Sequence, residues 1–267
     1  MKIHILHTGK VLIYRSLAYK ERGLHPAPYT GWLRRKENKM WVPVSSYLIE
    51  HPKGLILVDT GWNEDMRLNQ RKHLGNFAYS MYKGELPEGK SIAEQLYSLG
   101  VSSKELDFVI LSHMHSDHVS GLRHVKDAKK ILTSKIEWNA AQKKLGYIKT
   151  MWNNIAIDTF ELMDIPYGPY KEGFDLLRDE TLYLVYTPGH SDGMISTLVK
   201  MKNGWMVLAS DVGYSERSWK EMILPGITTD RKAAYQSLKW LRDFSLKRDC
   251  IKVIANHDAN VKPQIIE

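Results

Sequence analysis

A six-residue stretch near the middle of the chain concentrates side chains that can bind metal ions. HMHSDH, residues 113–118, places His113, His115 and His118 around Asp117. Such clustering serves no purpose on a solvated surface, and burying imidazoles and a carboxylate costs several kcal/mol unless each finds a partner. A metal ion can be that partner for several groups at once, so the stretch predicts a metal site.

Three more candidate ligands end separate apolar runs elsewhere in the chain. LYLVYTPGH ends at His190, WMVLASD ends at Asp211 and CIKVIANH ends at His257, as LDFVILSH ends at His113. Short apolar runs bounded by turn residues predict buried strands. Strand ends at one edge of a sandwich can converge on one point, so we expect these side chains to meet those of residues 113–118.

The donor types suit two ions that share a bridge. Imidazole binds zinc, copper, iron and nickel, whereas a carboxylate can bridge two ions. One ion would be held by His113, His115 and His190, and a second by Asp117, His118 and His257. Asp211 would bridge the pair. Two ions about 4 Å apart can share a water molecule and turn it into hydroxide at neutral pH.

The elements that must position these residues mix hairpins with strand–helix alternation. Strands are expected over residues 45–50, 55–59, 107–112, 182–186, 205–210 and 250–255. HPKG at 51–54 predicts a hairpin turn, and Asn203-Gly204 predicts another because both residues tolerate a positive φ. This mixture favours mixed sheets covered by helices over a purely parallel doubly wound fold.

Two helices have clear sequence signals. Ser91 and Glu94 form a capping-box pattern, and Gly100 supplies the stop for a helix that presents Ile92, Leu96 and Leu99 on one face. A second helix is expected to begin near Asp230, with an apolar stripe formed by Ala234, Leu238, Leu241 and Phe244 or Ser245.

Bulk properties are those of a globular protein, with 43% hydrophobic and 25% charged residues. No linker or repeat divides the chain, so residues 1–267 are expected to form one domain. No apolar run approaches the ~18 residues of a membrane span, and the N-terminus resembles no signal peptide. The single cysteine, Cys250, rules out an internal disulfide, and we expect a cytoplasmic protein without membrane partners.

The net charge of +8 is interpreted as a solvated basic surface. Short basic runs lie at residues 33–38, 142–149 and 246–252, and two of them contain or adjoin acidic residues. Charge alone speaks to solubility rather than to a site, so a nucleic-acid partner is not expected, although anionic substrates stay open.

The full set of motifs resembles the metallo-β-lactamase superfamily. HMHSDH matches its HxHxDH motif, and TPGHS, ASDVGY and NHD match its remaining ligand positions in order. The early DTG matches a supporting position, so Asp59 is expected to hold the site loops by hydrogen bonds. The resemblance spans about residues 45–258. It implies an α/β fold (α+β) of the αββα type, a sandwich of two mixed sheets flanked by helices, with a dinuclear site at one edge.

Within that superfamily the chain is most similar to the N-acyl-homoserine lactonases. Those enzymes carry a tyrosine three residues after the bridging aspartate, where Tyr214 stands, and VPVSSYLIE before LILVDTGW resembles their first strands. Many of them have an aromatic residue inside the motif, where this chain has Ser116. That position helps to shape the acyl-chain pocket in the family, so the sequence does not specify the acyl-chain preference.

The resemblance implies a metal-dependent hydrolase that opens a lactone ring, with N-acyl-homoserine lactones as the expected substrates and quorum quenching as the expected role. A metal-bridging hydroxide would attack the carbonyl, while Tyr214 would stabilise the developing oxyanion. Asp211 or Asp117 would pass a proton to the leaving alkoxide. Two divalent ions are implied, with zinc as the default and iron, manganese or cobalt as alternatives.

Other readings of the same site stay open. A phosphodiesterase or another ester hydrolase could use the two ions for in-line displacement. A catalytically silent metal-binding protein would keep the ligands without turnover. In each hydrolase reading the partner is a small molecule, and the protein is expected to be a monomer or a homodimer.

The remaining histidines and two aromatic-rich stretches have no assigned chemistry. Residues 27–41 and 147–154 are either lids over the site or packing loops. The histidines without spacing partners are interpreted as surface or hydrogen-bonded residues: His4, His7, His25, His51, His73 and His124.

Overall fold

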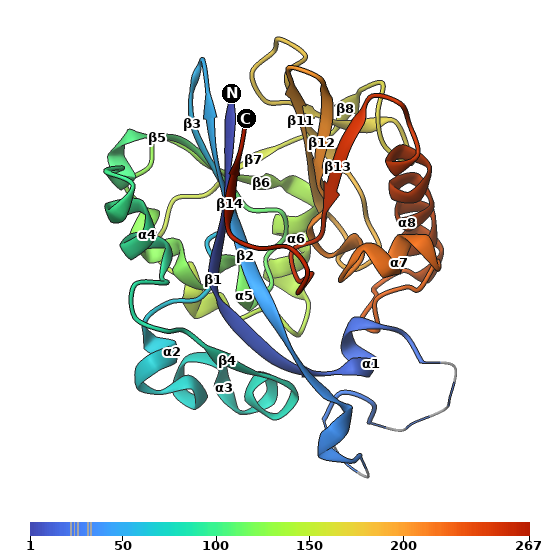
Figure 1. Ribbon diagram of the computed structural model, residues 1–267. Coiled ribbons are helices and arrows are strands. Elements are labelled where there is room, and N and C mark those ends of the chain that lie inside the picture. Colours follow the sequence, from blue (N-terminus) through green and yellow to red (C-terminus); the bar gives the residue numbers. More distant parts are fainter. Residues whose placement is uncertain (22, 24, 26, 31, 33) are drawn as a thin grey trace.

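The computed structural model describes residues 1–21, 23, 25, 27–30, 32 and 34–267. Two β-sheets form its centre, and helices lie on their outer sides (Figure 1). The first sheet contains β1 (Lys2–Tyr14), β2 (Lys39–His51), β3 (Gly54–Val58), β4 (Lys83–Glu85), β5 (Leu106–Ile110), β6 (Ile131–Ser134), β7 (Asp158–Phe160) and β14 (Gln264–Ile266). The second contains β8 (Met163–Asp164), β9 (Glu172–Asp175), β10 (Leu182–Tyr186), β11 (Ile195–Met201), β12 (Gly204–Leu208) and β13 (Cys250–Ile254).

Both sheets mix parallel and antiparallel pairs. The first has the order β14-β1-β2-β3-β5-β6-β7, with β4 added to β1. The pairs from β3 to β7 are parallel, whereas β1, β2, β3 and β14 pair antiparallel. The second has the order β13-β12-β11-β10-β9-β8, and its pair of β12 with β13 is parallel. The expected sandwich of two mixed sheets is therefore confirmed.

The helices cover the outer faces. They are α1 (Arg15–Ala18), α2 (Asp65–Leu68), α3 (Gln70–Met81), α4 (Ile92–Ser98), α5 (Ser116–Val119), α6 (Lys135–Lys143), α7 (Glu216–Lys220) and α8 (Arg231–Ser245). Short 3-10 turns are η1 (Lys36–Asn38), η2 (Ser103–Glu105), η3 (Ser120–Val125), η4 (Lys149–Met151) and η5 (Ser210–Val212). None of the helices within the described ranges has the length and apolar character needed to cross a bilayer.

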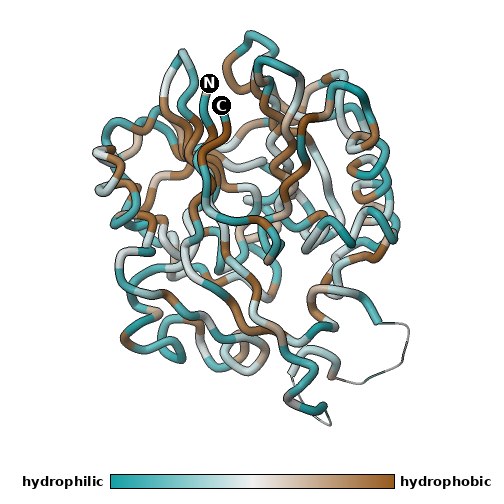
Figure 2. Tube along the Cα trace, in the orientation of Figure 1, coloured by the Kyte–Doolittle hydropathy of each residue, from teal (hydrophilic) through white to brown (hydrophobic). Residues whose placement is uncertain are grey.

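Alternation along the strands separates the inner core from the outer layers. Leu182 and Leu184 of β10 are buried between the sheets together with Ile110 of the first sheet. Tyr183 and Val185 of the same strand point the other way and pack in the cluster that contains α8 residues. Figure 2 shows the hydrophobic residues concentrated along the strands and the polar ones on the outer turns.

The strands and helices expected from the sequence are confirmed. Ser91 and Glu94 form both hydrogen bonds of the capping box at α4, although Leu99 lies 39% exposed rather than buried with Ile92. The β11–β12 hairpin is present, but Gly204 alone takes the positive φ, at 142°. A Cβ there would lie 2.2 Å from the Asp249 carbonyl oxygen, so the close approach requires glycine.

Candidate metal centre

All seven expected ligands come together where strand ends of the two sheets meet. The chain leaves β5 of the first sheet and turns through His113 and His115 into α5, which carries Asp117 and His118. The second sheet supplies the others from the segments that follow β10, β12 and β13: His190, Asp211 and His257. Their potential ligand atoms fall into three groups, each within 4.8 Å: a first of His113, His115 and His190, a second of Asp117, His118 and His257, and one of His113, His118 and Asp211 that connects these two.

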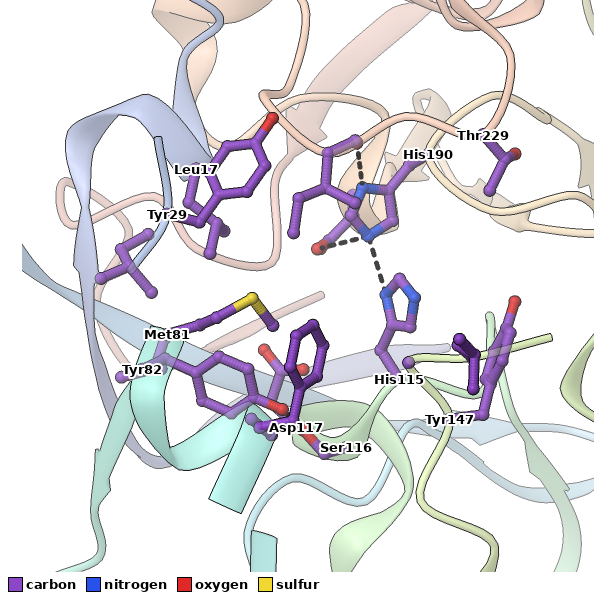
Figure 3. A pocket seen from close by; sticks show the side chains of 18 of the residues that line it. Leu17, Tyr29, Met81, Tyr82, His115, Ser116, Asp117, Tyr147, His190 and Thr229 are labelled. Carbon is purple, nitrogen blue, oxygen red and sulfur yellow. Dashed lines mark hydrogen bonds and ion pairs between the residues drawn. The ribbon is translucent and has the colours of Figure 1, made fainter. Parts of the chain in front are cut away.

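The first group consists of three histidines with converging ring nitrogens. His113 Nε2 lies 3.0 Å from His115 Nδ1, and that atom lies 2.9 Å from His190 Nε2. Figure 3 shows His115 and His190 facing each other across the wall of the pocket. Nitrogen lone pairs at such distances repel unless a proton or a cation lies among them, so the geometry suits a cation.

The second group joins Asp117, His118 and His257. His257 Nε2 lies 3.4 Å from Asp117 Oδ2, and both histidines are fully buried. Within the described part of the chain their Nε2 atoms have no hydrogen-bond partner, although each is shielded from solvent. Buried nitrogens without partners are costly, and a bound cation would remove that cost.

Asp211 lies between the two groups. Its Oδ2 is 3.5 Å from His190 Nε2, whereas its Oδ1 is 3.5 Å from His118 Nε2 and 3.3 Å from His257 Nε2. Oδ1 is also buried, and no described residue forms a hydrogen bond with it. One carboxylate oxygen thus faces each group, which is the arrangement that a bridging ligand needs.

Hydrogen bonds on the outer side orient three of the rings. His118 Nδ1 bonds Asp59 at 2.8 Å, while His190 Nδ1 and His257 Nδ1 donate to the carbonyls of Ile227 and Pro43 at 3.0 and 2.7 Å. With Nδ1 protonated, each Nε2 lone pair points into the site. Such partners commonly fix the tautomer of metal-binding histidines. The donor set therefore fits metal ions.

Asp59 holds the site loops as expected. Its carboxylate accepts hydrogen bonds from Ser112 N at 2.8 Å and Ser112 Oγ at 2.7 Å, in addition to His118. The backbone of Asp59 is left-handed, with φ of 59°. An aspartate tolerates this conformation better than most residues, and here it aims the side chain at the turn before His113.

The pKa values of the histidines differ between the two groups. Burial lowers the pKa of His113 and His115 well below the ordinary value, and their histidine neighbours lower it further. Burial also lowers the pKa of His190. These three rings are therefore neutral, which is the state that binds a metal.

Carboxylates dominate the second group. Burial opposes the charged form of His118, but Asp59 and Asp211 outweigh it and raise the pKa of this ring well above the ordinary value. His257 and His118 likewise overcome burial and hold the pKa of Asp211 well below its usual range. A positive charge is thus favoured in this half of the site, whether carried by protons or by a cation.

A cavity of about 340 Å³ opens above Asp117, Asp211 and His190. Its wall is mainly apolar and includes Val11, Ile13, Leu17, Phe77, Ala78, Met81, Leu145 and Ile227. An apolar cavity with a few polar groups at one end is typical of small-molecule sites.

Tyrosines surround the polar end of the cavity. Tyr214 is buried and its ring stacks on His257, with centroids 4.8 Å apart. Burial and the nearby Asp211 raise the pKa of Tyr214 well above its ordinary value, so the hydroxyl keeps its proton. Tyr82, which the sequence did not single out, bonds Ser116 Oγ through its hydroxyl at 2.7 Å and lines the cavity. Its ring reaches the cavity from the end of α3.

Both aromatic-rich stretches contribute to the wall. Tyr29 comes from residues 27–41, and Tyr147 comes from residues 147–154. Residues 31 and 33 of the first stretch lie outside the described residues.

Two of the histidines without assigned chemistry form hydrogen bonds away from the candidate ligands. His7 Nε2 donates to the Val261 carbonyl at 3.0 Å, and His73 Nε2 bonds Ser120 Oγ at 2.7 Å. Neither belongs to the three groups.

Comparisons with known proteins agree with this geometry. The profile of the metallo-beta-lactamase superfamily matches residues 40–243. The N-acyl homoserine lactonase AttM of Azorhizobium caulinodans is 27% identical over 230 residues, which cover 83% of this chain and 84% of that protein. The N-acyl homoserine lactonase of Bacillus cereus is 29% identical over 222 residues, covering 83% of each.

Two solved structures share the fold. N-acyl homoserine lactone hydrolase with its product N-hexanoyl-L-homoserine at the catalytic metal center gives a TM-score of 0.78 at 23% identity, covering 97% of this chain and 94% of that chain. AidC, a dizinc quorum-quenching lactonase, gives 0.65 at 18% identity, covering 96% and 87%.

Proposed function

The chain belongs to the metallo-beta-lactamase superfamily, and from this membership we propose that it is a lactonase that opens the ring of N-acyl homoserine lactones. The observation that carries the proposal is the placement of Asp211 between two ligand groups, at the floor of an apolar cavity. The curated relatives named N-acyl homoserine lactonase support this substrate class.

Two divalent ions would occupy the two groups, with Asp211 shared between them. Zinc is the default for a set dominated by imidazole, and iron, manganese or cobalt are alternatives. When bound, the ions would activate water for attack at neutral pH and polarise the lactone carbonyl.

Residues of the chain would then transfer the proton and stabilise the negative charge that develops on the carbonyl oxygen. Tyr214 would donate its hydroxyl proton in a hydrogen bond to the carbonyl oxygen as negative charge develops there. Asp117 or Asp211 would accept the proton of the attacking water and deliver it to the ring oxygen as the bond from that oxygen to the carbonyl carbon breaks. The product is the ring-opened hydroxy acid, which ionises at neutral pH and releases one proton.

The cavity wall favours this reaction over phosphodiester hydrolysis. Lys144 is the one cationic side chain among the described residues that line the cavity, and its Nζ pairs with Asp192 at 2.6 Å. An anionic phosphodiester would find little positive charge beyond the ions. An acyl chain would instead contact apolar residues such as Leu17 and Met81.

Proton release tests the proposal directly. Ring opening of short- and long-chain N-acyl homoserine lactones is followed with a pH indicator, and metal content is measured in each protein. Tyr214→Phe should lower kcat about 100-fold, and Asp211→Asn about 100-fold or more with loss of bound metal. Tyr235→Phe and Asp243→Asn, on the outer helix α8, are the matched controls. A protein that carries two ions and hydrolyses phosphodiesters but no lactone would overturn the proposal.

A further inference from the structure

A buried carboxylate outside the candidate ligand set ties the first group together. Glu137 lies in the first turn of α6, and its side chain is fully buried. Its Oε1 accepts hydrogen bonds from Met114 N at 2.9 Å and from the Tyr147 hydroxyl at 3.1 Å. Its Oε2 accepts from Ser191 Oγ at 2.7 Å and from Gly193 N at 3.0 Å.

Three of the four donors belong to the segments that carry the first ligand group. Met114 stands between His113 and His115, and Ser191 directly follows His190. The first segment comes from the first sheet and the second from the second sheet. One carboxylate therefore links the two loops that place His113 Nε2 and His190 Nε2 each within about 3 Å of His115 Nδ1.

The remaining donor, Tyr147, packs against the ring of the candidate ligand His115. Tyr147 packs against His115 with ring centroids 5.3 Å apart and an interplanar angle of 35°. The hydrogen bond from its hydroxyl to Glu137 holds the tyrosine in that position. Among the described residues His115 has no outer hydrogen bond like those of His118, His190 and His257, so Tyr147 supports its ring from outside the ligand set.

The fold brings α6 unusually close to the His190 loop to make these contacts. A Cβ at Gly193 would lie 2.1 Å from the Glu137 backbone nitrogen and 2.5 Å from Ser134 Oγ. Ser134 caps α6 by accepting from Glu137 N at 3.0 Å and donates to the Gly193 carbonyl at 2.7 Å. Only glycine fits between the helix and the loop.

The stability of the fold does not explain why a carboxylate is buried at position 137. Among the described residues no cationic side chain compensates the charge of Glu137, and burial raises the pKa of its carboxyl despite the four hydrogen bonds. A buried carboxylate without a counterion opposes folding. Costly polar groups of this kind persist mainly where a site needs them.

We propose that Glu137 is a positioning residue that holds the His113/His115/His190 group in its metal-binding geometry by linking residues 114, 147, 191 and 193. The inference rests on the proposed two-ion site. Outer hydrogen-bond partners of metal ligands typically change metal affinity by about 10- to 100-fold when they are removed.

The test measures zinc affinity at each group separately by competition with a chromophoric chelator. His257→Ala leaves the first group as the complete one, and His115→Ala leaves the second. Glu137→Gln keeps the size of the side chain but offers an amide N–H to two of the four donors. It should weaken zinc binding about 10- to 100-fold in the His257→Ala protein and leave it unchanged in the His115→Ala protein.

Controls separate this role from a general loss of structure. Glu94→Gln changes another hydrogen-bonded carboxylate, in the capping box of α4, and should alter neither affinity. If Glu137→Gln does not fold, Tyr147→Phe and Ser191→Ala each remove a single donor, and each should weaken the first group alone.

The outcomes also distinguish the inference from the proposed function. Unchanged zinc affinity in both backgrounds, or equal weakening of both groups, would overturn the role of Glu137 while leaving the two-ion site in place. Failure of the wild-type chain to bind zinc, iron, manganese or cobalt would overturn the proposed function itself.

Discussion

At the residue scale, the shortest hydrogen bond that orients His118 is the one with Asp59. Asp59 Oδ2 lies 2.8 Å from His118 Nδ1 and also accepts from Ser112 Oγ. Asp59→Asn should keep the left-handed backbone, because asparagine tolerates it equally well, but remove the charge that favours the metal-binding ring orientation. We expect zinc affinity at the second group to fall about 10- to 100-fold.

Metal titration of Asp59→Asn would check this expectation. Asp65→Asn, at a half-exposed site on α2, is the matched control and should bind both ions normally. Two ions bound with wild-type affinity in Asp59→Asn would show that Ser112 and the backbone alone orient the loop.

Tyr82 is expected to set the acyl-chain preference together with Ser116. The hydroxyl of Tyr82 bonds Ser116, so the tyrosine ring fills the part of the cavity next to the HMHSDH loop. Tyr82→Ala should enlarge the cavity and raise kcat/KM for long-chain relative to short-chain lactones by about tenfold. The ratio is measured with a chain-length series, and Tyr97→Ala, whose side chain is 86% exposed, is the control. An unchanged ratio would place the acyl chain elsewhere.

At the element scale, α4 offers a prediction about pH. Hydrogen bonds from Arg67, at 3.0 and 2.6 Å, lower the pKa of Glu94, and the capping-box contact with Ser91 N adds to the effect. A lowered folded-state pKa stabilises the protein above the unfolded value, near 4.5, and this stability is lost as pH falls through the lowered value.

Glu94→Gln should therefore cost about 1 kcal/mol of unfolding free energy at pH 7 and progressively less below pH 4.5. Urea unfolding of both proteins across that range gives the difference directly. A difference that stayed constant with pH would mean that the charge on Glu94 contributes nothing.

Elements with strong local signals could be predicted, whereas those fixed by distant contacts could not. The strand ends, the capping box of α4 and the stripe of α8 each follow from residues close in sequence. By contrast, α3 is interrupted by Gly75 at φ of 75°, and its polar sequence gives little periodic signal.

The same distinction applies to the site. Its candidate ligands lie in short motifs, and so they could be named from spacing and type. Tyr82 and Glu137 could not, because Tyr82 follows a helix without a clear pattern and Glu137 reads as an ordinary polar residue in α6. Only the packing of α6 against the His190 loop reveals that it is buried.

At the scale of the whole molecule, the candidate ligands join the two sheets. Ions that bind the folded chain but not the unfolded one stabilise it, by about 2.7 kcal/mol when free metal is about 100 times the dissociation constant. Removal of metal by chelation should therefore lower Tm by roughly 5–10 °C, and added zinc should restore it. Thermal unfolding followed by circular dichroism is the measurement. An identical Tm for both forms would mean that ions bind the folded chain no better than the unfolded one.

The strand order described above bears on how copies of the molecule meet. Both sheets end in short strands: β14, β4 and β7 have three residues each, and β8 has two. The remaining border strand, β13, has five residues and carries the exposed Lys252. Short or charged borders discourage strand addition and the growth of fibrils. Self-association of this protein should therefore use its helices and loops, and should leave both sheets closed to further strands.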